Sequence, residues 1–306
     1  MKKVVITGAT GMIGVSLVNQ LVSNGIFCLL LVKKEYIKPN TLPVSDLCKV
    51  EECDLHDLEK FDYKDKDFDV FIHLGWMSTI GLGRDDAFLQ EKNIKVSLDA
   101  VALAKKLGCN KFVGVGSQAE YGVTNSILSP ELSCNPQSGY GIAKYSAGKL
   151  TRILANKLGI SHCWIRILSV YGPNDNPNTL ISYLINCLKN NIAPTLTPCE
   201  QIWDYIYVDD CSKAIISICE KGVDKKTYLI ASGEPKRLKE YVLIVKNAIN
   251  PTMRVVFGGK NYPKNQPMFL KADISELKKD TGFTPCISFE EGIKRTIKYM
   301  EKQNDN

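Results

Sequence analysis

Three side chains near the middle of the sequence could together move a proton to or from a carbonyl or an alcohol. Ser117 ends an apolar run, and Tyr140 and Lys144 lie four residues apart in "YGIAK". This spacing puts two side chains on the same face of a helix. A phenol has an ordinary pKa of about 10, and a nearby ammonium favours its ionised form, so we expect Lys144 to lower the pKa of Tyr140. Ser117 could hold a substrate oxygen beside the phenol.

A glycine-rich turn near the start of the chain predicts a dinucleotide cofactor. "VVITGATGMIG" places Gly8, Gly11 and Gly14 directly after an apolar run and at the start of a helix-like stretch. Glycines at this spacing allow a tight turn and let the backbone approach a pyrophosphate at the positive end of the helix. Met12 and Ile13, between the last two glycines, are assigned to the same site.

The adenosine end of that cofactor is predicted from the next two strand ends. A site for NAD usually has an acidic residue near the end of the second strand, where it accepts the ribose 2′-hydroxyl. Lys33 and Lys34 follow that strand here, which favours a 2′-phosphate and hence NADP(H), with NAD(H) as the alternative. Asp54 and its neighbour Leu55 end the third strand-like stretch, where the carboxylate could meet the adenine amino group.

The run "HLGW" ends the following strand and predicts the nicotinamide end of the site. Leu74 and Gly75 are assigned to the cofactor, because a glycine there permits close backbone approach, and Trp76 is assigned to the substrate. His73 lies inside the apolar run, so we interpret it as a core histidine. Ile167, at the end of a later strand, is also assigned to the cofactor.

These side chains need a framework of parallel strands whose ends meet at one edge. Short apolar runs alternate with longer periodic segments, which predicts an α/β fold with a Rossmann-like doubly wound parallel sheet and a smaller, mixed α/β C-terminal substrate domain. We assign 1–168 and 204–235 to the cofactor domain, and 169–203 and 236–306 to the substrate domain. Strands are expected at 4–7, 27–32, 70–74, 112–115 and 161–167, and helices at 11–23, 89–107, 140–158 and 180–189. Ser288 and Glu291 form a capping-box start for a last helix.

Composition excludes several other classes of protein. The net charge of +6 is spread along the 306 residues, with no lysine-rich block of the kind that binds nucleic acid. The apolar runs are far shorter than the roughly 20 residues that cross a bilayer. The 11 cysteines include no Cys-x-x-Cys pair, so we expect free thiols and no metal site. A cytoplasmic protein is expected, with no membrane partner.

Taken together, these motifs resemble the extended short-chain dehydrogenase/reductase family, and more narrowly its NAD-dependent epimerase/dehydratase branch. "SPELSCNPQSGYGIAK", "RILSVYGPNDN", "WDYIYVDDCSKAI" and the C-terminal "DISELKKDTGFTPCISFEEGIKRTI" extend the resemblance almost end to end. It implies a nicotinamide cofactor across the strand ends and a nucleoside-diphosphate sugar held by the smaller domain. Tyr140 would be the acid/base at the sugar C4 oxygen, Lys144 would bind the nicotinamide ribose, and Ser117 would bind the C4 oxygen. The resemblance also suggests a homodimer through helices 89–107 and 140–158, whose apolar faces could equally be core.

The neighbours of Ser117 narrow the reaction that the resemblance allows. Dehydratases of the branch carry an Asp-Glu pair where this chain has Gln118 and Ala119, and an amide and a methyl group cannot exchange protons. The 3,5-epimerase/4-reductases use a cysteine at the position of Ala119 and a histidine at that of Asn174. What remains is a 4-ketoreductase using NADPH, with a TDP- or CDP-linked 4-keto-6-deoxysugar as substrate, or a 4-epimerase with retained NAD. The lysines after the second strand favour the reductase.

The substrate side is the least specified. Besides Trp76 and Ser117, we assign Gln118, Asn174, Gln201 and Trp203 to the nucleotide sugar, although Trp203 could equally be interdomain packing. Arg166 is either structural or an anchor near the pyrophosphate, and the sequence does not choose between them.

Overall fold

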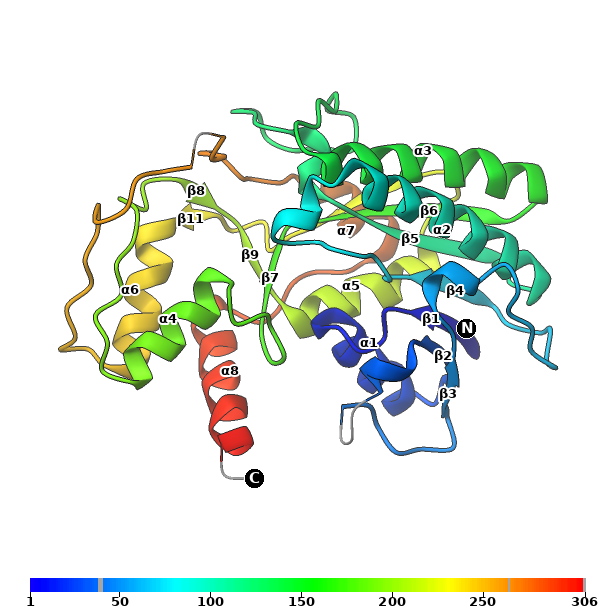
Figure 1. The fold of residues 1–306 in the computed structure, drawn as a ribbon, viewed down its shortest axis with the longest axis horizontal. Helices are drawn as coiled ribbons and strands as arrows, with labels where there is room; N and C mark the ends of the chain where they lie inside the picture. Colours follow the sequence, from blue (N-terminus) through cyan, green and yellow to red (C-terminus); the bar gives the residue numbers. More distant parts are fainter. Residues whose placement is uncertain (38–40, 264, 305–306) are drawn as a thin grey trace.

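A seven-stranded parallel sheet forms the larger lobe of the computed structural model, which describes residues 1–37, 41–263 and 265–304 (Figure 1). The strand order is β10-β6-β5-β4-β1-β2-β3. The strands are β1 (Lys3–Thr7), β2 (Phe27–Val32), β3 (Cys48–Glu52), β4 (Val70–His73), β5 (Lys111–Ser117), β6 (Ser161–Ile167) and β10 (Thr227–Ile230). The predicted Rossmann-like sheet is thus confirmed, and the direction of the order reverses at β1, the point where such sheets bind dinucleotides.

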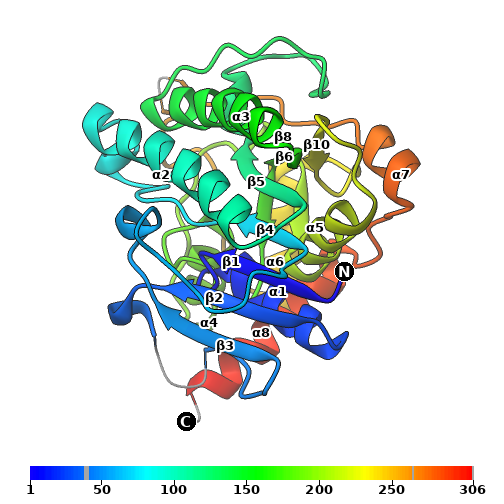
Figure 2. The same ribbon diagram turned by 90° about the vertical axis from the view of Figure 1, so that its right-hand side faces the viewer.

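Two pairs of helices cover the two faces of this sheet. α1 (Met12–Ser23) packs with α5 (Val208–Lys221), and α2 (Ala87–Lys106) packs with α3 (Gly139–Leu158) on the opposite face (Figure 2). Because both faces are covered, the inner strands are continuous apolar runs, such as "VFIH" in β4, whose four residues are all buried. These inner strands could therefore be predicted from their apolar runs in the sequence. The edge strand β3, "CKVEE", has no fully buried residue and gave a weaker pattern.

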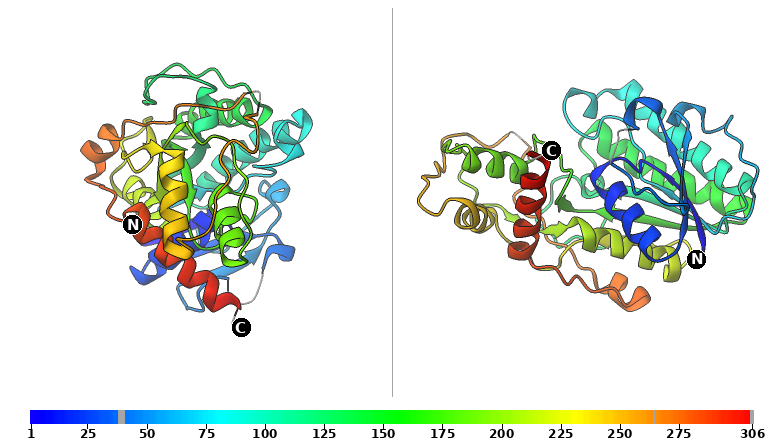
Figure 3. Two further views of the ribbon diagram at one scale, coloured as in Figure 1. Left: turned by 90° about the vertical axis from the view of Figure 1, so that its left-hand side faces the viewer. Right: turned by 90° about the horizontal axis from the view of Figure 1, so that it is seen from below.

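A smaller lobe packs beside the carboxyl ends of these strands (Figure 3). It contains α4 (Leu180–Lys189), α6 (Leu238–Ile249) and α8 (Phe289–Asn304), with a parallel pair formed by β7 (Ser169–Tyr171) and β9 (Tyr205–Tyr207), and an antiparallel pair formed by β8 (Ile202–Trp203) and β11 (Lys236–Arg237). Its core is a cluster of aromatic rings that includes Tyr171, Tyr241 and Phe289. The backbone N–H of Glu291 donates to the Ser288 hydroxyl at the start of α8, one half of the expected capping box.

One part of the tail packs differently from the division expected. α7 (Ser275–Thr281) lies against α5 and β10, and Leu277 and Phe283 belong to the core cluster of the sheet. The chain from about 275 to 283 therefore returns to the larger lobe before α8 enters the smaller one.

All 11 cysteines are free thiols, of which eight are buried, Cys48 and Cys134 are partly buried and Cys286 is exposed. No helix of the described chain combines the length and the apolar character that crossing a membrane requires. Within the same residues, no group of three or more His, Cys, Asp or Glu side chains is arranged to hold a metal ion.

Candidate active site

Ser117, Tyr140 and Lys144 come together where β5 ends and α3 begins. The Ser117 hydroxyl and the Tyr140 phenol are hydrogen-bonded to each other. Tyr140 is 8% exposed and Lys144 is 3% exposed, whereas Ser117 is half-buried. Ser138 caps α3, accepting a hydrogen bond from the Gly141 N–H at 3.1 Å, which fixes the first turn that carries Tyr140. The four-residue spacing places Lys144 one turn further on, on the same buried face.

Burial shifts the pKa of both Lys144 and Tyr140 in the direction that favours the neutral form of each group. It lowers the pKa of Lys144 to about 7, and its Nζ donates to the Val115 carbonyl at 2.6 Å and lies 3.7 Å from the centre of the Trp76 ring. Burial raises the pKa of Tyr140, while the hydrogen bond with Ser117 and the charge of Arg84 oppose that rise. The expectation that Lys144 lowers the pKa of Tyr140 is therefore wrong for this arrangement, because the ammonium is directed to Val115 and Trp76.

A buried carboxylate that the sequence analysis missed holds Ser117 in place. Glu120 Oε1 accepts the backbone N–H of Ser117 at 2.9 Å and the indole N–H of Trp164 at 3.0 Å. Its Oε2 accepts from Arg166 Nε at 2.8 Å, and Arg166 also donates to the Tyr121 hydroxyl at 2.8 Å. Arg166 is thus structural. The pairing of Glu120 with Arg166 depends on the neighbouring strands β5 and β6, in which Gly116 lies opposite Arg166, and the sequence alone did not show this register.

The glycine turn has the shape that a pyrophosphate needs. Gly8 has φ of +74°, and a Cβ there would lie 2.7 Å from the Gly75 backbone nitrogen. A Cβ on Gly14 would lie 2.2 Å from the Gly8 carbonyl, whereas one on Gly11 would meet nothing nearer than 3.6 Å. Gly11 therefore borders open space. α1 begins there with Met12 and Ile13, without a side-chain cap or an acidic residue in its first turn. These features fit an anion at the helix N-terminus.

The loop after β4 joins this turn to the candidate catalytic side chains. The Thr7 hydroxyl accepts the Gly75 N–H at 3.2 Å and pairs with His73 Nδ1 at 2.8 Å. His73 is 2% exposed, and burial lowers its pKa to about 3, so its interpretation as a core histidine is confirmed. Leu74 is partly buried against the sheet core, and Leu55 packs directly beneath Gly75. Ile167 lies opposite Ser117 in the sheet register.

A cavity of about 720 Å³ lies at the ends of β2 and β3, where the adenosine end was predicted. Lys33 Nζ lies 3.0 Å from a Glu35 oxygen and 3.4 Å from an Asp54 oxygen, so two carboxylates compensate its charge. The backbone N–H of His56 and the Lys33 ammonium lower the pKa of Asp54. Lys34 lines the same cavity and is exposed. Among the residues that the structure describes, Lys34 takes part in no ion pair.

The residues assigned to the substrate fall into two groups. Trp76 lies beside the catalytic side chains, 6.0 Å from the Tyr140 ring, and its indole N–H donates to Gln90 at 3.0 Å. Gln118 follows Ser117 at the start of the short helix η4 (Gln118–Tyr121). Gln201 and Trp203 instead make their hydrogen bonds with Tyr262 and Ser169, and Trp203 packs between two core clusters. This arrangement matches the packing alternative for Trp203.

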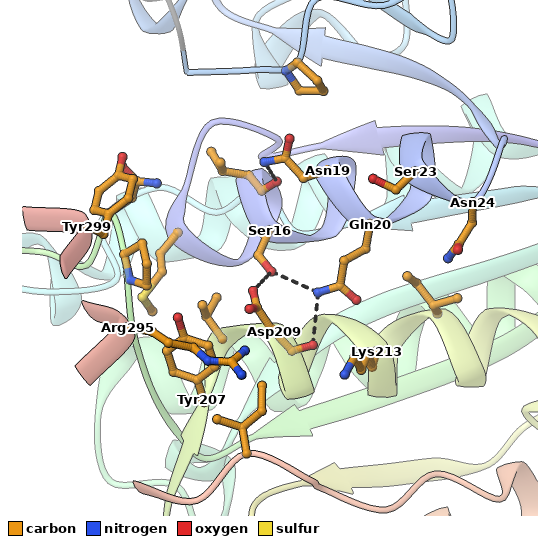
Figure 4. Close-up of a pocket in the computed structure, with 18 of the residues that line it drawn as sticks. Ser16, Asn19, Gln20, Ser23, Asn24, Tyr207, Asp209, Lys213, Arg295 and Tyr299 are labelled. Atoms are coloured by element: carbon orange, nitrogen blue, oxygen red, sulfur yellow. Dashed lines mark hydrogen bonds between the residues drawn. The ribbon is translucent and has the colours of Figure 1, made fainter. Parts of the chain in front are cut away.

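Asn174 lines a separate cavity of about 850 Å³ between α1, α5 and α8 (Figure 4). It has φ of +63°, and its side-chain oxygen accepts from the Tyr299 hydroxyl at 2.7 Å. The lining of this cavity does not include Ser117, Tyr140 or Lys144. Its polar groups bind one another, as Ser16 and Gln20 do with Asp209. The structure thus does not bring Asn174 into contact with Ser117, Tyr140 or Lys144.

Comparison with known proteins agrees with this geometry. The chain is 28% identical over 310 residues to the CDP-abequose synthase of Salmonella typhimurium, covering 97% of this chain and 98% of that protein. Its fold is similar to that of a UDP-N-acetylglucosamine 4-epimerase from Methanobrevibacter ruminantium, with a TM-score of 0.89, 24% identity and 99% of each chain covered. It is also similar to that of a UDP-glucuronic acid 4-epimerase from Bacillus cereus solved with NAD, with a TM-score of 0.85, 22% identity, and 99% of this chain and 98% of that chain covered.

The sequence profile of the NAD dependent epimerase/dehydratase family matches residues 4–231, a span that contains the glycine turn, Ser117, Tyr140 and Lys144. Because this match spans most of the chain, the chain belongs to the NAD dependent epimerase/dehydratase family.

Proposed function

We propose that this protein uses NADPH to reduce the C4 keto group of a nucleoside-diphosphate 4-keto-6-deoxysugar, linked to TDP or CDP. The observation that carries the proposal is the assembly of Ser117, Tyr140 and Lys144 beside Gln118 and Ala119. The chain has the groups that act at C4 and lacks an acid/base pair for a neighbouring carbon. Its similarity to a CDP-abequose synthase supports the same reaction class.

In this reaction each side chain has a defined task. NADPH, when bound, would supply the hydride that C4 receives. The Ser117 hydroxyl would hold the C4 oxygen beside the phenol, and Tyr140 would donate its proton to that oxygen, so that the carbonyl becomes an alcohol. A phenol whose pKa is raised by burial keeps its proton at neutral pH, as a proton donor must. Lys144, one turn further along α3, would bind the nicotinamide ribose.

The pyrophosphate would be held by the glycine turn and the start of α1, that is by Gly8, Gly11, Met12, Ile13 and Gly14. The nicotinamide half would be bordered by Leu74, Gly75 and Ile167. Of the two lysines, Lys34 is assigned as the main partner of the 2′-phosphate of NADP(H). The charge of Lys33 is already compensated by the carboxylates of Glu35 and Asp54. Asp54 and Leu55 would border the adenosine. The smaller lobe, with 169–203 and most of 236–306, would hold the nucleotide sugar. Gln201 and Asn174 would bind the end of the nucleotide sugar that lies farthest from Tyr140.

A second candidate is a nucleotide-sugar 4-epimerase with retained NAD. The likeness of the fold to two UDP-sugar 4-epimerases favours it. An epimerase must first remove a proton from the C4 hydroxyl, which needs an ionised Tyr140. Because burial raises the pKa of Tyr140, that step is harder for this phenol than proton donation.

A panel of TDP-, CDP-, GDP- and UDP-linked 4-keto sugars with NADPH tests the proposal. We expect consumption of NADPH equal to the sugar reduced, with one deuterium found at C4 by mass spectrometry when the cofactor carries deuteride. Tyr140→Phe serves as the inactive control. Purification with stoichiometric NAD, together with interconversion of two hexose epimers without net loss of NADPH, would establish the epimerase instead.

A further inference from the structure

A charged side chain that the reaction above does not use lies directly against the catalytic phenol. Arg84 ends the short helix η3 (Leu82–Arg84) in the loop between β4 and α2. The central carbon of its guanidinium lies 4.3 Å from the centre of the Tyr140 ring, within the range of a cation–π contact. We propose that Arg84 is a positioning residue of the active site, a permanent cation that favours loss of the Tyr140 proton. This inference rests on the assignment of Tyr140 as the proton donor.

The loop holds Arg84 in this place from both sides. Arg84 Nη1 donates to the Thr79 carbonyl at 2.7 Å. The next residue, Asp85, accepts the backbone N–H of Gly139 at 2.8 Å, which docks the loop on the first turn of α3. A Cβ on Gly139 would lie 3.2 Å from the Asp85 Cα, so the contact is close. The guanidinium is therefore fixed relative to the helix that carries Tyr140.

The charged groups around Tyr140 leave a place for such a cation. On α3, Lys144 lies 5.8 Å from the ring centre and has a pKa of about 7, so it is only partly charged at neutral pH. From η4, Glu120 disfavours the phenolate, although Arg166 neutralises much of its charge at 2.8 Å. Asp85 is occupied at the N-terminus of α3. A guanidinium keeps its charge at every pH at which proteins fold.

The same arrangement indicates what Arg84 adds to the reaction. The raised pKa of Tyr140 suits proton donation, but a phenol held too firmly in its neutral form would transfer the proton slowly. Arg84 opposes the effect of burial on Tyr140, whereas Lys144 is proposed to bind the cofactor. The loop that carries Trp76 and Arg84 thus packs against Tyr140 and also lowers the proton affinity of its phenol.

The test replaces Tyr140 with 3,5-difluorotyrosine, whose phenol is more acidic than that of tyrosine and so titrates at a lower pH. Its single ¹⁹F resonance is followed against pH in the cofactor-free protein. We expect Arg84→Met to move the midpoint up by about half to one pH unit, and Arg84→Lys, which keeps a cation, to stay closer to the wild type. Arg254→Met, at an exposed arginine in the smaller lobe, is the matched control and should leave the midpoint unchanged.

An unchanged midpoint in Arg84→Met would overturn the inference. Should that variant fail to fold, Arg84→Gln, which keeps a donor for the Thr79 carbonyl, takes its place. Because the titration needs neither cofactor nor sugar, it is independent of the proposed reaction. A shifted midpoint in a protein that reduces no 4-keto sugar would support the role of Arg84 and remove the proposed function.

Discussion

At the scale of single residues, the phenol of Tyr140 is the group on which the proposed reaction depends. Tyr140→Phe removes the proton donor and leaves the ring packed between Trp76 and Arg84. We expect NADPH-dependent turnover to fall by roughly 100-fold or more, because general acids contribute about that much to the rate. Cofactor affinity, measured by calorimetry, should change little. Near-normal turnover in this variant would show that another group donates the proton.

Lys144 predicts how the stability of the protein depends on pH. Burial lowers its pKa to about 7, whereas the unfolded chain has the ordinary lysine value, so the unfolded state binds one more proton between these values. The free energy of unfolding should therefore rise with pH above about 7 in the wild type relative to Lys144→Met, by about 1 kcal/mol per pH unit. Below that range both states are protonated and the difference should be flat.

Urea unfolding of the two proteins at several pH values between 6 and 9 measures this difference. A difference that stays constant across the series would mean that Lys144 keeps its charge in the folded state.

Lys34 determines the proposed preference for NADPH. Lys34→Ala should weaken NADPH binding by at least about tenfold, because a hydrogen bond to a charged group contributes about 1.5–3 kcal/mol. NADH binding should be nearly unchanged. Glu35→Gln should act in the opposite direction, because it removes one of the carboxylates paired with Lys33. Fluorescence titration with both cofactors checks the pair, and equal effects on NADPH and NADH would exclude the 2′-phosphate assignment.

At the scale of elements, the β1–α1 turn separates two kinds of glycine. Gly14→Ala would place a methyl group 2.2 Å from the Gly8 carbonyl, and we expect a loss of about 2 kcal/mol or more in the free energy of unfolding. Gly11→Ala meets nothing nearer than 3.6 Å and should fold with almost wild-type stability. Its methyl group would nevertheless occupy the space proposed for the pyrophosphate, so its affinity for NADPH should fall.

Thermal melts and calorimetry on the same two variants test this distinction. Gly11→Ala serves as the folded control for Gly14→Ala. If Gly11→Ala bound NADPH as well as the wild type does, the pyrophosphate could not lie on this turn.

At the scale of the whole molecule, the sequence predicted the sheet well because buried parallel strands are almost purely apolar. β2 and β6 were predicted with the bounds that the structure shows, and the four helices that were given bounds, α1 to α4, were predicted to within two residues. The same reasoning failed where a role depends on contacts between distant segments. Glu120, Arg84 and the return of 275–283 to the larger lobe follow from packing that spacing along the chain does not encode. The pKa of Tyr140 was mispredicted because sequence spacing cannot report the extent of burial.

The outer surface of α2 and α3 carries the remaining proposal, a homodimer. Ile142, Leu150 and Ile153 lie along one side of α3 with exposed fractions of 52%, 42% and 67%, and Phe88 at the start of α2 is 82% exposed. Apolar side chains gathered in this way on a helix pair favour a second copy of the chain as partner. We expect Ile153→Arg to convert the dimer to a monomer, because the new charge would be buried in the interface without a partner.

Light scattering coupled to size-exclusion chromatography measures this change directly. Ile192→Arg is the matched control, because Ile192 is 57% exposed but lies after α4 in the smaller lobe, away from the helix pair. It should remain a dimer. Since Tyr140 and Lys144 lie on the buried face of α3 and Ile153 on the exposed one, monomeric Ile153→Arg should still bind NADPH. A wild-type protein that is monomeric at micromolar concentration would instead mean that this apolar surface has another function.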